Sequence, residues 1–116
     1  MIGISPTVAI WLYNQPVDMR KQFDGLAALT QTKLNCRANN GELFVFINRK
    51  RTQIKLLYYH QGGYCIWSKR LEKGTFHTVS GEHKITLDWT QLQCLIGGIN
   101  WQEKPRNTRL TRSVRV

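Results

Sequence analysis

The centre of the chain contains a continuous apolar run, Leu43-Phe44-Val45-Phe46-Ile47, rich in β-branched and aromatic side chains. Turn-forming residues follow at 48–52 and again at 61–63, and they delimit two further mixed segments at 53–59 and 64–71. Strands joined by such short loops are usually antiparallel neighbours. We therefore predict a three-stranded β-meander. This pattern leaves the strand register open, so it does not decide which face of the second strand is exposed to water.

The residues before the meander predict a strand and a helix. An apolar run at 8–13 ends in the turn signal Asn14-Gln15-Pro16, which is typical of a buried strand followed by a turn. Asp18 comes next, and apolar side chains then recur at helical spacing. An Asp directly before such a stripe is typical of a helix N-cap. We predict one long amphipathic helix from about Met19 to about Lys33.

A short strand and a short helix are predicted after the meander. Residues 84–87 suit the strand. Asp88 and Gln91 then have the spacing of a capping box, and Gly97-Gly98 supplies a stop. The apolar stripe of this helix consists of Leu92, Leu95, Ile96 and Ile99.

Taken together, these elements predict a small single domain of the α+β class that occupies residues 1–101. The chain has 116 residues, which is enough for one hydrophobic core. Residues 102–116 contain few apolar side chains and many cations, so we predict a basic, flexible tail.

The apolar and cysteine content predict a cytoplasmic protein. The longest apolar stretch, residues 8–13, is far shorter than the roughly 20 residues that span a bilayer, so we expect no contact with a membrane. The three cysteines, Cys36, Cys65 and Cys94, are odd in number and widely spaced. We interpret them as small buried apolar residues in a reducing compartment. The oligomeric state is left open.

Positive charge is concentrated in two stretches. The chain has 17 Lys+Arg and 7 Asp+Glu, a net charge of +10. Residues 49–73 and the segment after 103 contain most of this excess, and clustered cations favour a polyanionic partner such as DNA. The predicted nucleic-acid-binding residues are Arg20, Lys21, Arg49, Lys50, Arg51, Lys55, Lys69, Arg70, Lys73, Arg106, Arg109 and Arg112.

Two features allow both a structural and a functional interpretation. In the segment Asp18-Met19-Arg20-Lys21, the cations are either a solvated helix face or, with free backbone N–H groups, a phosphate contact. The aromatic residues Tyr58, Tyr59, Tyr64 and Trp67 either fill the core, which we favour, or form a stacking platform for single-stranded nucleic acid.

No catalytic site is evident in the sequence. Asp18 and Asp88 are accounted for as helix caps, and the remaining acids lack the arrangement that a two-metal carboxylate site needs. His60, His77 and His83 have no ligand at zinc spacing. Gly62-Gly63 is typical of a hairpin turn and not of a phosphate loop. We therefore predict no catalytic residue, no metal, no cofactor and no enzymatic activity.

Several motifs together resemble one bacterial family. They are Pro16-Val17-Asp18-Met19-Arg20-Lys21-Gln22-Phe23-Asp24-Gly25-Leu26, Leu43-Phe44-Val45-Phe46 with Asn48-Arg49-Lys50-Arg51, Ile54-Lys55-Leu56-Leu57-Tyr58, Cys65-Ile66-Trp67-Ser68-Lys69-Arg70-Leu71-Glu72-Lys73-Gly74 and Gly98-Ile99-Asn100-Trp101. The chain closely resembles the TnpB-type accessory protein, the second open reading frame product, of insertion sequences of the IS-sixty-six class. The resemblance implies a transposition accessory factor that is encoded beside a separate, catalytic transposase.

The sequence therefore predicts a non-catalytic accessory protein that binds DNA or the transposase–DNA complex. One alternative is an adaptor that binds the transposase without touching DNA. A second alternative, from another class, is a small nuclease or strand-transfer enzyme.

Overall fold

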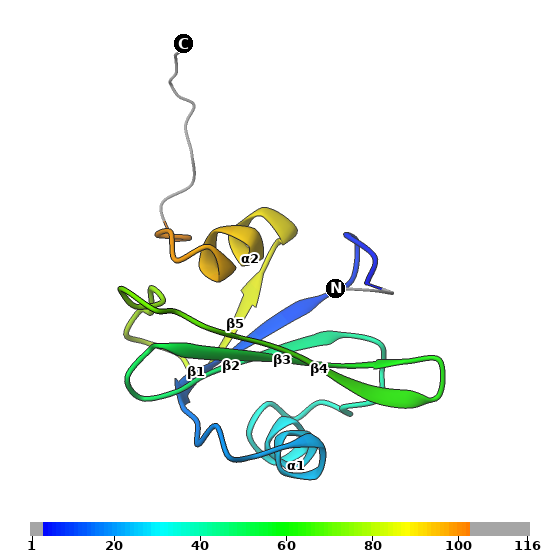
Figure 1. Cartoon of the computed structure of the whole chain (residues 1–116). Helices are drawn as coiled ribbons and strands as arrows, with labels where there is room; N and C mark the ends of the chain where they lie inside the picture. The colour runs from blue at the N-terminus through cyan, green and yellow to red at the C-terminus, as the bar shows by residue number, and fades with distance from the viewer. Residues whose placement is uncertain (1–3, 103–116) are drawn as a thin grey trace.

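The computed structural model describes residues 4–102, which form one five-stranded sheet with a helix on each face (Figure 1). The strands lie in the order β4-β3-β2-β1-β5. In chain order the elements are β1 Ile10–Pro16, α1 Phe23–Lys33, β2 Leu43–Ile47, β3 Gln53–His60, β4 Gly63–Arg70, β5 Lys84–Leu87 and α2 Trp89–Ile96.

The sheet is mixed, which corrects the predicted α+β class built on an antiparallel meander. Strands β2, β3 and β4 do pair antiparallel. However, β1 lies parallel to β2 and antiparallel to β5. Because the chain crosses from β1 to β2 through α1, it returns to the sheet in the same direction. The run at 43–47 is thus a central strand and not one edge of a meander.

The prediction of a long N-terminal helix from residue 19 is also wrong. Helix α1 begins at Phe23, and its N-cap Gln22 makes no side-chain cap. Asp18 is not a helix cap, because its carboxylate accepts a hydrogen bond from the backbone N–H of Arg20 at 2.9 Å. An Asp side chain that bonds the backbone two residues on stabilises a turn and competes with helix formation. Helix α1 is consequently 11 residues long.

Burial on both faces explains the unbroken apolar pattern of β2. All five of its residues are buried. Leu43, Val45 and Ile47 belong to the cluster under α2, whereas Phe44 and Phe46 belong to the cluster under α1. A strand that is covered on both sides has no polar alternation.

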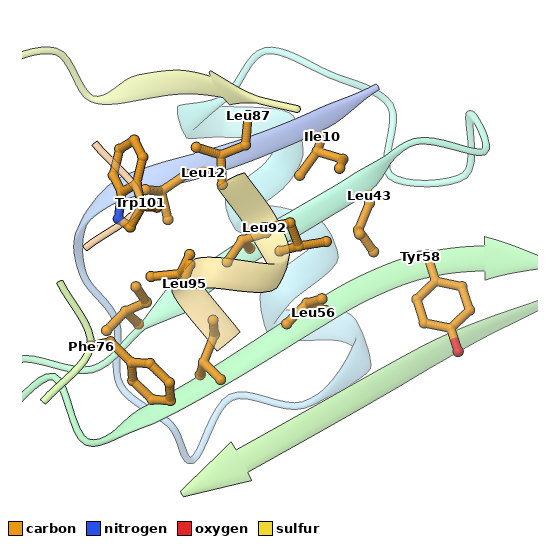
Figure 2. Close-up of a cluster of buried hydrophobic side chains, with 13 residues drawn as sticks. Ile10, Leu12, Leu43, Leu56, Tyr58, Phe76, Leu87, Leu92, Leu95 and Trp101 are labelled. Carbon is orange, nitrogen blue, oxygen red and sulfur yellow. The ribbon is translucent and has the colours of Figure 1, made fainter. Parts of the chain in front are cut away.

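The core cluster beneath α2 extends along the whole sheet (Figure 2). Leu92 and Leu95 of α2 lie over the strands, Phe76 and Trp101 close the cluster at one end, and Tyr58 lies at the other.

The three cysteines are free and half-buried, so they are less buried than predicted. No helix within residues 4–102 is long and apolar enough to cross a membrane.

Helix α2 has the predicted capping box. The Asp88 carboxylate accepts from the Gln91 backbone N–H at 2.7 Å, and the Gln91 side-chain oxygen accepts from the Asp88 N–H at 2.9 Å. Gly98, with a positive φ of 75°, follows the helix and allows the chain to reverse.

We expect Asp88→Ala to lower the free energy of unfolding by about 1 kcal/mol, because it removes the acceptor at the start of α2. Asp88→Asn keeps an acceptor of similar reach and is expected to unfold close to wild type. Urea denaturation of the three proteins measures the difference. Equal stability of the Ala and Asn variants would contradict the role given to the cap.

Candidate nucleic-acid interface

Three loops meet at the end of the sheet where the parallel strands β1 and β2 finish, and we call this the basic end. They are residues 17–22, 48–52 and 71–83. The Val17 N–H donates to the Ile47 carbonyl at 3.0 Å and ties the first loop to β2. The first half of the third loop is held against the second, because the Leu71 and Phe76 N–H groups donate to the carbonyls of Thr52 and Arg51. In Figure 1 these loops lie at the left of the sheet, opposite the β3–β4 turn.

The turn at 48–52 is organised by one side chain. The Asn48 Oδ1 accepts from the N–H groups of Thr52 at 2.8 Å and Gln53 at 3.0 Å, while Nδ2 donates to the Thr52 hydroxyl at 3.1 Å. Arg51 completes the turn with a left-handed φ of 60°. The side chains of residues 49–51 take no part in these hydrogen bonds, and all three residues are exposed.

Besides Arg20 and Lys21 in the first loop, five exposed cations gather at the basic end. Arg70, at the end of β4, lies opposite Gln53 in the sheet and so beside the turn. Lys73 lies between Leu71 and Phe76, whose N–H groups are bonded to the same turn. Within residues 4–102, none of the five forms an ion pair. The five are Arg49, Lys50, Arg51, Arg70 and Lys73.

The cation at position 20 already has a partner. Its guanidinium donates to the Asp18 carboxylate, with Nη2 to Oδ2 at 2.6 Å, and its side chain is 91% exposed. The hydrogen bonds from the Arg20 side chain and then from its backbone N–H lower the pKa of Asp18 to about 2. Lys21 is exposed beside α1. Because Asp18 stays ionised, it offsets the charge of Arg20, and this favours the structural interpretation of the segment.

Two of the predicted DNA contacts are engaged within the fold. The Lys55 ammonium donates to the carbonyls of Met19 at 2.7 Å and Lys21 at 2.9 Å, and Lys55 is only 7% exposed. The Lys69 ammonium donates to the carbonyl of Ile96 at 2.8 Å. A cation at the carboxyl end of α2 is also favoured by the helix dipole. Arg106, Arg109 and Arg112 lie outside the described residues.

Concave surfaces accompany the cations. A shallow hollow of about 610 Å³ separates the loop at 17–20 from the turn at 48–53. A smaller cavity of about 170 Å³ lies where β1 and β2 diverge, and both Arg49 and Arg51 line it. The irregular register of β1 between Leu12 and Pro16 accounts for this divergence. A one-dimensional pattern has no signal for either hollow, because the lining comes from separate loops.

Of the four aromatic residues, Tyr58 and Trp67 support the core interpretation, whereas Tyr59 and Tyr64 belong to neither core cluster. Tyr58 is buried, and this burial raises the pKa of its phenol. The neighbouring Cys65 is a second, smaller cause of the same rise in pKa. Tyr59 and Tyr64 make an edge-to-face contact at 5.1 Å, and Tyr64 is 37% exposed. Trp67 is half-buried against the cluster under α2. In the part of the chain that the structure describes, no three His, Cys, Asp or Glu residues group as metal ligands.

A family model described as "IS66 Orf2 like protein" matches residues 8–106. The chain belongs to this family. The IS66 Orf2-like match spans every strand and helix of the domain, and it confirms the resemblance found in the motifs. The family associates the protein with transposition of insertion sequences, in an accessory role.

Two relatives of this IS66 Orf2-like protein come from Sinorhizobium fredii (strain NBRC 101917 / NGR234). The uncharacterized protein y4hO is 32% identical over 97% of this chain and 98% of its own length. The uncharacterized protein y4jC is 28% identical over 91% of this chain and 92% of its own length. No solved structure matches the chain significantly.

Proposed function

We propose that this IS66 Orf2-like protein is a non-catalytic transposition factor that binds DNA, or the complex of DNA with the separately encoded transposase, through its basic end. The observation behind the proposal is that five exposed cations, from the turn at 48–52, the end of β4 and the loop at 71–83, gather there without acidic partners among the described residues. Family membership supports the setting, since it links the chain to insertion sequences.

The arrangement suits a phosphate backbone. Each Lys or Arg that neutralises a phosphate releases condensed counterions, which adds affinity without reading the base sequence. The loops bring the cations together beside a shallow hollow. Side chains on such loops can contact successive phosphates and thereby position the protein on a duplex.

The tail residues Arg106, Arg109 and Arg112 belong to the same proposal. The Trp101 indole N–H donates to the His77 carbonyl at 2.7 Å, which fixes the end of the described chain beside the loop at 71–83. The described chain therefore ends close to the basic end, and the cations after residue 102 are proposed to contribute to the same DNA contact.

We expect binding to duplex DNA from the element's ends to be weakly specific and strongly salt-dependent. If about five phosphates are contacted, a plot of log K against log salt concentration has a slope of roughly −4 to −5. Fluorescence anisotropy of labelled duplex at several salt concentrations, with and without transposase, measures the slope. Incubation of the same duplex with Mg²⁺ serves as the control for cleavage.

Two results would contradict this function. Absence of binding at low salt, combined with a tight complex with the transposase alone, would support the adaptor alternative. Metal-dependent cleavage or joining of the duplex by the purified protein would support the nuclease alternative.

A further inference from the structure

The two edges of the sheet differ sharply in their protection. Edge strand β5 has only four residues and begins with Lys84. Edge strand β4 has eight residues, pairs with β3 in unbroken register, and contains no proline or bulge. Its middle residues, Tyr64-Cys65-Ile66-Trp67-Ser68, are uncharged. In Figure 1, β4 lies at the front of the sheet, with no other element in front of it. A long edge with an uncharged middle readily adds a further strand.

The hydrogen-bond pattern shows which backbone groups of β4 are free to pair. Just beyond β4, the Leu71 N–H donates to the carbonyl of Thr52, the residue before β3, and this bond continues the β3–β4 register. The N–H and C=O groups of successive residues point to opposite sides of a strand. Those of the odd-numbered residues of β4 therefore point toward β3. The N–H and C=O groups of the even-numbered residues therefore face away from the sheet. These residues are Tyr64, Ile66, Ser68 and Arg70.

We infer that β4 pairs antiparallel with β4 of a second copy of this chain, centred on Trp67, to form a two-fold dimer with a continuous ten-stranded sheet. The side chains on each face restrict the register. The odd-numbered Cys65 and Trp67 pack on the α2 side, whereas Ile66 packs on the α1 side. A continuous sheet requires directly opposed residues to share a face. The two-fold axis must then pass through the position of one residue. An axis at Trp67 pairs all of residues 64–70 with the second copy.

The side chains of this register are complementary. Trp67 lies opposite its own symmetry mate, and aromatic cross-strand pairs are favourable. Arg70 lies opposite Tyr64, which allows a cation–π contact, and Lys69 lies opposite Cys65. No cation therefore opposes another cation, and β4 contains no acid. DNA suits the middle of this edge poorly, since five consecutive residues there have no cation to neutralise a phosphate.

The dimer has a consequence for DNA binding that rests on the proposed function. Antiparallel pairing of β4 directs the two basic ends in opposite directions, one at each end of the strands of the joined sheet. Each dimer would then hold two separate DNA segments. The experiments on the dimer contain no DNA, so their outcome is independent of whether the basic end binds it.

Ser68→Pro tests the pairing without disturbing the sheet within one chain. The Ser68 N–H faces away from β3, and proline is tolerated in edge strands at such positions. The variant removes two intermolecular hydrogen bonds per dimer, so we expect the dissociation constant to rise roughly 30-fold or more. Sedimentation equilibrium measures it, with Ser68→Ala as the matched control and circular dichroism to verify folding. A monomeric wild type, or a folded Ser68→Pro variant as dimeric as Ser68→Ala, would overturn the inference.

Cysteine cross-linking tests the register even if the proline variant fails to fold. In this register residue 66 lies opposite residue 68 of the other copy, at a Cα separation of about 5.5 Å that a disulfide can bridge. Ile66→Cys and Ser68→Cys are made separately in a chain whose Cys36, Cys65 and Cys94 are replaced by Ser. A mixture is expected to form the mixed disulfide on mild oxidation, with little product from either variant alone. Equal yields with and without mixing, or none, would refute the Trp67-centred pairing.

Discussion

Replacing Lys55 by methionine is expected to lower the free energy of unfolding by about 3 kcal/mol. The ammonium group of this buried lysine donates to the carbonyls of Met19 and Lys21. Methionine fills similar space but donates no hydrogen bond, so both carbonyls lose a charged partner. The loop between β1 and α1 is then held less firmly against β3. In a domain of this size, such a loss lowers the melting temperature by about 10 °C or more.

Lys50→Met is the matched control for this prediction, because Lys50 is exposed and makes no hydrogen bond within the described residues. Its stability should remain within about 0.5 kcal/mol of wild type. The two variants are compared by calorimetry and by DNA binding, in which Lys55→Met should keep the wild-type salt slope. A shallower slope with unchanged stability would show that Lys55 contacts DNA, as the charge pattern suggested, and would exclude the structural role.

The double variant Arg49→Gln/Lys50→Gln is expected to weaken DNA binding by one to two orders of magnitude at about 0.1 M salt. Removing two phosphate contacts should also make the salt slope shallower by about 2. Both residues lie on the exposed turn that Asn48 organises. Glutamine keeps most of each side chain and removes only the charge, so folding should be unaffected.

The matched control is Lys33→Gln/Arg37→Gln, which removes the same two charge types. Lys33 ends α1 and Arg37 follows it, at the opposite end of the sheet from the basic end, and both are exposed. We expect this variant to keep nearly the wild-type affinity and slope in the same anisotropy titration. If both double variants lost affinity equally, binding would depend on net charge and the basic end would have no special role.

The sequence was informative where local physical chemistry decides the structure. The apolar run at 43–47 and the turn after it become β2 and the turn that begins at Asn48. The capping box at Asp88 and Gln91 is present as predicted. These features depend on neighbours within a few residues, so their pattern in the chain is sufficient.

Asp18 shows where local reading fails. An Asp before an apolar stripe is a typical N-cap, but here its carboxylate accepts hydrogen bonds from the backbone N–H and the guanidinium of Arg20. The buried Lys55 reinforces this turn from β3, 34 residues further along the chain than Lys21. Sequence spacing has no signal for that contact. A single lysine within the mainly apolar stretch Ile54-Lys55-Leu56-Leu57 was the one available hint that its charge is used inside the fold.

By itself, the sequence determined the positions of most strands, the second helix, the excess of positive charge and the family, because each rests on residue types in local order. Only the tertiary structure decided the parallel pairing of β1 with β2, which puts the turn at 48–52 beside the loops at 17–22 and 71–83. It also separated the exposed cations from Lys55 and Lys69, whose ammonium groups are bonded to backbone carbonyls. The physical reason is that charge is counted along the chain, whereas solvation and hydrogen bonding depend on which segments the fold brings together.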